Sequence, residues 1–146
     1  MKKVLYLRLD ALLVFLAILV LGGLAIYVLQ QQTPEEAAEE FLQALAKKDI
    51  DKLLQVTYLE NPTRPLREQW DFCLNQAAKN YIFIWNYVGS QRIDEEHASV
   101  KVEFMVFHGL EPSYEEPIEI PLVLRDGKWK VDLNSLSRKF FPALPK

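Results

Sequence analysis

The side chains best suited to chemistry are one histidine and two tyrosines. His108 stands at the end of a predicted strand, and Tyr81 and Tyr87 belong to the predicted strand before it. A histidine can transfer a proton near neutral pH, and a tyrosine hydroxyl can hold a polar group of a small molecule. The pattern places no carboxylate on the same face as His108. We therefore expect a rim histidine, assign no catalytic residue, and keep these three residues as weak ligand-binding candidates.

The remaining reactive side chains point to structural roles. His97 lies in a predicted turn behind the acidic run 94–96, and such an exposed run is more often solvated than an ion site. Cys73, the single cysteine, lies among apolar residues and is expected to be a small buried hydrophobe. No nucleophile motif, phosphate-binding loop or metal-ligand spacing is present in the sequence. We therefore predict no metal site and no cofactor.

The charge balance bears on the choice of partner. The chain has 146 residues, with 17 basic and 20 acidic side chains and a net charge of −3. The basic residues form no cluster that would neutralise phosphates, so nucleic acid is not expected as a partner. A single cysteine allows no internal disulfide. The folded part must therefore be held together by packing.

Residues 11–29 form the most distinctive stretch of the chain. They contain no charged residue and no proline, and as a helix they would be about 28 Å long, close to the ~30 Å hydrocarbon thickness of a bilayer. A cleaved signal peptide is the alternative interpretation. It typically has a shorter apolar region and a small-x-small cleavage site, which this stretch lacks. The pattern therefore favours a retained transmembrane helix.

Charged residues on either side of this stretch predict its orientation. Lys2, Lys3 and Arg8 precede it, whereas the first charges after it are glutamates. Because basic flanks stay on the cytoplasmic side, the N-terminus is expected in the cytoplasm of a cell-membrane protein with one span. The predicted division is a cytoplasmic tail (1–10), a transmembrane helix (11–29), a short linker (30–33) and an extracytoplasmic domain (34–146).

Three helices are predicted at the start of this domain. Thr33 can cap the first one, with Pro34 at its first position and Glu36 completing a capping box. Asp49 can cap a second, short helix. A third is expected over about 65–79, with an apolar side made of Leu66, Trp70, Cys73, Leu74 and Ala77.

After Asn80 the apolar period changes to alternation, which predicts strands at 81–93, 98–108, 116–125 and 128–133, with turns at 94–97, 109–114 and 126–127. Pairing Ile93 with Ala98 would put His108 opposite Phe83 and turn the core face toward the helices. Pro117 and Pro121 both lack an N–H on one side of their strand, which fits a short last strand at the sheet edge. The predicted fold class is thus α+β, with a helical layer packed on a curved four-stranded antiparallel sheet.

Three segments carry a family resemblance: TPEEAAEEFLQALAKKDIDKLLQ, the AxVxV strand at 98–102, and PLVLRDGKWKVDL. The chain resembles membrane-anchored or secreted bacterial members of the nuclear transport factor 2-like (cystatin-superfold) group. The resemblance implies a sheet wrapped on helices around a conical pocket. That group contains isomerases, binding modules and assembly domains of envelope machinery, so the resemblance leaves the activity open.

The predicted register also puts apolar side chains on the outer face of the sheet, where polar ones would be expected: Ile82, Ile84, Met105, Phe107 and Pro117. Such a patch is normally covered. A second copy of the chain, another envelope protein or the apolar tail 140–145 could cover it, and the tail could instead enter the bilayer.

The leading hypothesis is a non-catalytic, membrane-anchored binding or assembly module with this outer face as its partner surface. The alternatives are a small-molecule-binding or isomerase-like pocket using Tyr81, Tyr87 and His108, and a subunit of a secretion or conjugation assembly. A filled interior would argue against the pocket.

Overall fold

The computed structural model describes residues 2–29, 31–109 and 111–146, without the side chains of residues 2–11, 26–29, 108, 112, 114 and 115. The chain forms two units, Met1–Gln31 and Gln32–Lys146. The first contains helix α1 (Lys2–Leu29), which begins nine residues before the predicted span. As far as its helices are described, none is both long and apolar enough to cross a membrane. The transmembrane helix stays a prediction.

In the second unit, helices α2 (Pro34–Lys47) and α3 (Ile50–Val56) begin at the predicted caps. The Thr33 hydroxyl accepts a hydrogen bond from the Glu36 backbone N–H at 3.2 Å, and the Glu36 carboxylate accepts one from the Thr33 N–H at 3.0 Å. The Asp49 carboxylate accepts from the Lys52 N–H at 3.0 Å. The capping box and the second cap are therefore confirmed, and each satisfies N–H groups that a helix start leaves unpaired.

The third predicted helix is present but changes its winding. Helix α4 (Leu66–Phe72) continues into a π-helical turn, η1 (Cys73–Ala77). A π-helical turn has one more residue than an α-helical turn, and the Ala78 N–H accordingly bonds the Cys73 carbonyl at 2.8 Å. The extra residue rotates the helix face, so Ala78 is buried and Ala77 is exposed. The placement of Ala77 on the apolar side was wrong for this reason.

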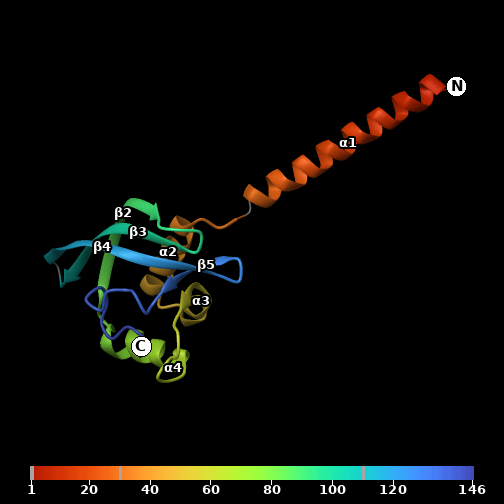
Figure 1. Ribbon diagram of the computed structural model, residues 1–146. Helices are drawn as coiled ribbons and strands as arrows, with labels where there is room; N and C mark the ends of the chain where they lie inside the picture. Colours follow the sequence, from red (N-terminus) through yellow and green to blue (C-terminus); the bar gives the residue numbers. More distant parts are fainter. Residues whose placement is uncertain (1, 30, 110) are drawn as a thin grey trace. The chain divides into compact units, whose positions relative to one another are not determined.

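The sheet has five strands in the order β1-β5-β4-β3-β2, and α2 lies across it (Figure 1). The strands are β1 (Thr57–Tyr58), β2 (Ile82–Arg92), β3 (His97–His108), β4 (Glu111–Arg125) and β5 (Lys128–Asp132). The last four pair antiparallel as predicted. The predicted count of four strands and the edge position of the last one were wrong, because β1 pairs in parallel with β5. The α+β class is confirmed.

The two turns of the later hairpins differ in outcome. Asp126 and Gly127 have positive φ angles of 53° and 74°, which confirms the predicted two-residue turn. The predicted turn over 109–114 was wrong, since β4 already begins at Glu111. Gly109, with φ of 71°, allows a shorter turn. Pro112 is tolerated in β4 because this part of the strand pairs with β3 alone.

The register between β2 and β3 contains a bulge at Val88 that the alternation did not reveal. Arg92, and not Ile93, is opposite Ala98. This is one residue away from the predicted pairing. The bulge adds a second one-residue shift for the residues before Val88, so Phe83 lies opposite Val106 instead of His108. The predicted pairing of Ile93 with Ala98 was therefore wrong. The faces of residues 82–87 are nevertheless as predicted, because the total displacement there is two residues.

The core lies between the sheet and the helices, and the irregular segment after β5 completes it. Phe140 packs against Phe104, with ring centroids 4.8 Å apart, and Phe141 packs edge-on against Tyr81 at 4.9 Å. Both phenylalanines and Leu144 are buried. This segment returns to the region of α4, where the C-terminus lies (Figure 1). All residues of the core cluster belong to the unit Gln32–Lys146.

Candidate functional site

The outer face of β2 and β3 carries exposed apolar side chains. Ile82 is 63% exposed and Ile84 is 49% exposed. They lie opposite Phe107 and Met105, respectively, which are half-buried. We call these four residues the outer patch. The four side chains share the outer face that the sequence predicted, although their strand pairing differs from the predicted one by two residues. The fold does not require apolar residues there.

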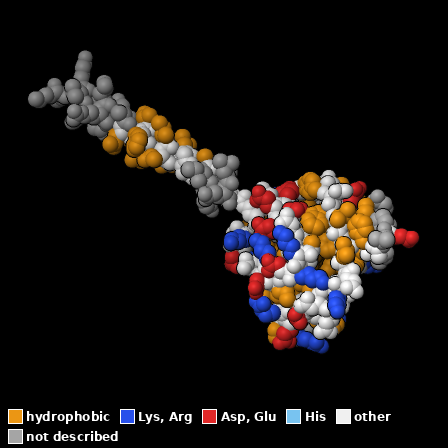
Figure 2. Space-filling model, turned by 180° about the vertical axis from the view of Figure 1, so that it is seen from behind, with side chains coloured by type: hydrophobic (Ala, Val, Ile, Leu, Met, Phe, Trp, Pro, Cys, Tyr) orange, Lys and Arg blue, Asp and Glu red, His pale blue; other side chains and the backbone are white. Residues whose placement is uncertain are grey.

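The C-terminal tail does not cover the outer patch. Phe140, Phe141 and Leu144 point into the core, on the opposite face of the sheet. Figure 2 shows hydrophobic side chains gathered at the surface of the domain among mixed charges. The tail 140–145 is therefore excluded as the cover of the outer patch, which leaves a second copy of the chain or another envelope protein.

The interior of the domain is filled by aromatic rings. Phe83 stacks on Phe104 with centroids 4.6 Å apart, and Phe140 and Phe141 close the space between the sheet and α2. The Tyr81 hydroxyl donates a hydrogen bond to the Phe140 carbonyl at 3.4 Å. A ligand in a conical interior would have to displace these rings.

Tyr81 and Tyr87, two of the three predicted ligand-binding residues, do not face one common space. Tyr81 packs beside the tail, whereas Tyr87 is 57% exposed. The side chain of His108 lies outside the described residues. Phe83, which was expected opposite this histidine, faces Val106. The structure thus supports no shared pocket for Tyr81 and Tyr87.

Tyr87 instead borders an open hollow of about 430 Å³ beside the start of α2. The other lining residues are all acidic: Glu35, Glu36, Glu39 and Glu40. Spacing of three and four residues puts glutamates on one side of a helix, and this spacing was visible in the sequence. What the sequence did not show is that the bulged end of β2 lies against them.

Two hydrogen bonds join β2 to this acidic side of α2. The Trp85 indole N–H donates to the Glu39 carboxylate at 2.8 Å, and the Ser90 hydroxyl donates to Glu35. The bond from Ser90 lowers the pKa of the Glu35 carboxyl, because it stabilises the charged form. These two hydrogen bonds hold β2 against α2, so both sides of the hollow belong to regular secondary structure.

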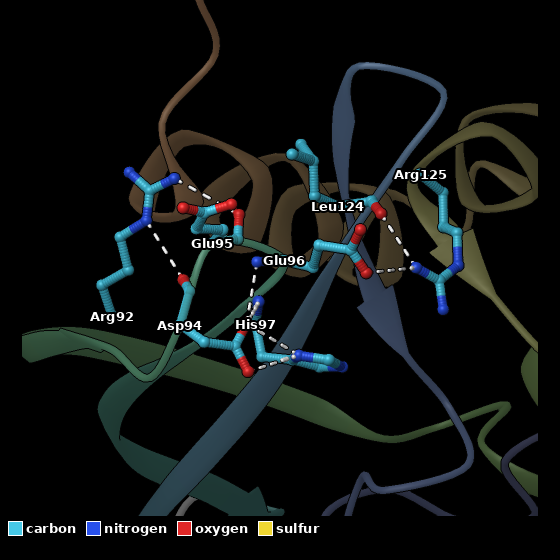
Figure 3. Close-up of polar contacts among 7 residues, drawn as sticks. All are labelled: Arg92, Asp94, Glu95, Glu96, His97, Leu124 and Arg125. Atoms are coloured by element: carbon cyan, nitrogen blue, oxygen red, sulfur yellow. Dashed lines mark hydrogen bonds and ion pairs between the residues drawn. The ribbon is translucent and has the colours of Figure 1, made fainter.

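The acidic turn between β2 and β3 is held by its own hydrogen bonds. The Asp94 carboxylate accepts from the N–H groups of Glu96 and His97, both at 2.8 Å, and lies 2.9 Å from the His97 Nδ1 (Figure 3). The Glu96 bond and then the histidine lower the pKa of Asp94. Arg125 lies 3.6 Å from the Glu96 carboxylate. Asp94 therefore closes the turn, as short polar side chains commonly do.

Two further features concern reactivity. Cys73 is fully buried, its thiol donates to the Pro142 carbonyl at 3.1 Å, and burial raises its pKa to about 12. The expected buried hydrophobe is confirmed. Within the described side chains, no three or more histidine, cysteine, aspartate or glutamate residues lie where they could share a metal ion.

No protein-family model matches the chain, and none of the curated proteins matches it. It is similar to a number of solved structures, including the following three. A protein described as a calcium/calmodulin-dependent protein kinase type II association domain from Thiobacillus denitrificans is 19% identical, with a TM-score of 0.49, and the match covers 68% of this chain and 89% of that one. A ketosteroid isomerase-like protein from Erwinia carotovora is 17% identical, with a TM-score of 0.49 and coverage of 66% and 86%.

The third is an NTF-2 like protein of unknown function from Shewanella oneidensis, 14% identical, with a TM-score of 0.47 and coverage of 66% and 88%. The second and third carry names from the superfamily that the sequence motifs resemble. At these identities and scores the likenesses carry no argument about activity. The function is therefore argued from the surfaces of this chain.

Proposed function

We propose that the protein is a non-catalytic binding or assembly module whose partner surface is the outer patch. The observation that carries the proposal is the exposure of Ile82 and Ile84 on the outer face, while the apolar tail packs into the core. Covering a contiguous apolar surface with a partner removes it from water, at about 25 cal/mol per Å². The partner is a second copy of the chain or another envelope protein.

The filled interior supports the non-catalytic part of this proposal. Acid-base catalysis needs a proton-transferring group within hydrogen-bond reach of a bound substrate. Phe140 and Phe141 occupy space between the sheet and the helices, among the other buried apolar side chains of the core cluster.

The location we propose rests on the sequence of the first unit. Residues 11–29 lack charges, and three basic residues precede them, which supports a single-pass anchor with residues 34–146 outside the cytoplasm. Protease added to intact cells should then remove the domain. A mature form that begins near Gln30 would overturn the anchor. No contact in the described part of the chain favours the narrower hypothesis of a secretion or conjugation subunit.

A double variant tests the partner surface. Replacing Ile84 and Phe107 by lysine should abolish association and leave the domain folded with a cooperative melting transition, because both side chains lie outside the core. Phe72→Lys is the matched control, since Phe72 is 51% exposed on α4. Sedimentation measures the mass of each variant. Equal association of the wild type and the double variant would overturn the proposal.

The hollow beside Tyr87 supports a second candidate function, the binding of a small organic cation. Four glutamates line the hollow, of which Glu40 is paired with Lys52 at 2.7 Å, and an exposed tyrosine ring can lie against a cationic group. Titration with tetramethylammonium and with a neutral isostere, followed by the NMR signals of Tyr87, tests this function. Equal responses to the two compounds would exclude it.

A further inference from the structure

The sheet has two long stretches of strand edge without a neighbouring strand, as far as the chain is described. One is β2, which pairs with β3 alone. The other is residues 111–121 of β4, because β5 pairs with residues 122–125. Such edges present free backbone N–H and C=O groups to other chains, and natural proteins protect them with prolines and charged side chains.

The β4 edge is protected in this way. Residues 111–121 contain three prolines, at 112, 117 and 121, and four glutamates, at 111, 115, 116 and 119. A proline has no N–H to donate to an added strand, and the glutamates repel another acidic chain. This edge is closed to strand pairing.

The β2 edge has neither form of protection. Residues 82–91 include no proline and no charged side chain, and the isoleucines at 82 and 84 are exposed beside the edge. The bulge at Val88 kinks the strand, which confines regular pairing to residues 82–87. Unlike the β4 edge, residues 82–87 of β2 therefore form a regular, uncharged edge that can pair with a strand of another chain.

We infer that β2 pairs antiparallel with β2 of a second copy, which joins two sheets into one. Because the β4 edge is closed, pairing between copies has to use the same strand from each chain. Such an isologous contact closes at two copies and forms no fibre. Backbone hydrogen bonds then supply the affinity, as in other cases of strand addition. This inference rests on the proposed function, takes a second copy as the partner, and places the contact at the edge that borders the outer patch.

Two-fold symmetry and the bulge together restrict the register. In an antiparallel pair about a two-fold axis, a residue lies opposite its own copy, and opposed side chains share a face. With the axis at Ile84, Phe83 lies opposite Trp85 and Ile82 opposite Asn86, all before the bulge. An axis at Trp85 would place Ile82 opposite the bulged Val88. Ile84 is therefore the expected centre.

Cysteine crosslinking tests this register. Ile84→Cys should form a disulfide-linked dimer on mild oxidation, at least 10-fold faster than Val88→Cys. Val88 is the matched control because it lies on the same strand and is also 49% exposed. Because Cys73 is buried, it should form little disulfide-linked dimer, and oxidation of the wild type measures this background. Equal rates for the two variants, or a faster Val88→Cys, would overturn the inference.

Hydrogen exchange distinguishes pairing through the β2 edge from association through the outer patch. The full chain in detergent micelles and the unit 32–146 are compared across a range of concentrations. Edge pairing slows exchange at alternate amides of residues 82–86 as the dimer forms. A dimer without this protection overturns the edge pairing and leaves the outer patch as the interface. A monomer at every concentration overturns the inference, and the proposed function then rests on another envelope protein.

Discussion

Truncation of Phe104 tests the position of the core and the strand register together. Its side chain is 2% exposed, and its ring lies 4.6 Å from that of Phe83 and 4.8 Å from that of Phe140. Phe104→Ala removes both ring contacts and leaves a cavity, at a cost of about 3 to 5 kcal/mol. A unit of this size is stable by about 6 to 17 kcal/mol. The variant should therefore melt about 10 to 25 °C lower.

Urea denaturation of the wild type and Phe104→Ala, followed by tryptophan fluorescence, measures the loss. Phe72→Ala is the matched control, because Phe72 is half exposed and its truncation should cost less than about 1 kcal/mol. A loss below about 1 kcal/mol for Phe104→Ala would refute the reasoning. It would show that the residue faces solvent and that the register is off by one residue.

Phe140→Ala should also cost about 3 to 5 kcal/mol and Lys139→Ala almost nothing, since the first side chain is core and the second is exposed; chemical denaturation checks both. Thr33→Ala should lose about 1 kcal/mol with its capping bond, seen in the melting curve. The Cys73 thiol should resist alkylation at pH 8 in the folded protein and react after unfolding. Because folding raises the pKa of Cys73 from 9.0 to about 12, the unfolded state loses the proton first, and the free energy of unfolding should fall as the pH rises through this window. The free energy of unfolding of Cys73→Ala should depend less on pH in the same window.

Local sequence signals predicted most of the fold. Thr33 and Asp49 were identifiable as caps because capping is a contact within four residues. The Asp126-Gly127 turn was identifiable because two successive positive φ angles restrict the residue types. Alternation placed Phe104 inside and Ile84 outside, since a strand repeats every two residues.

The missing parts depend on contacts that no local pattern encodes. Strand β1 has two residues, too few to show a period, and exists because β5 lies beside it. The bulge at Val88 and the π-helical turn at Cys73 each add one residue, and alternation or helical spacing cannot reveal such an insertion. The tail around Phe140 is apolar but irregular. Its place in the core depends on the space that α2 and the sheet leave.

The outer patch could be predicted from the sequence more completely than the hollow beside Tyr87. Ile84 and Phe107 followed from the strand period alone. Tyr87 was placed on the inner face correctly, yet its surroundings depend on where α2 crosses the sheet. Glu35 and Glu39 were visible as a pair on one side of a helix, but the hydrogen bonds that tie them to β2 were not.

Methyl NMR on serial dilution tests the partner surface most directly. The methyl signals of Ile82, Ile84 and Met105 should shift as the protein is diluted, because the contact on or beside the outer patch is lost when the copies separate. The methyl signals of Ile93, which is exposed outside the outer patch, should stay in place. Unchanged signals from the outer patch at every concentration, or shifts confined to Ile93, would contradict self-association through this face.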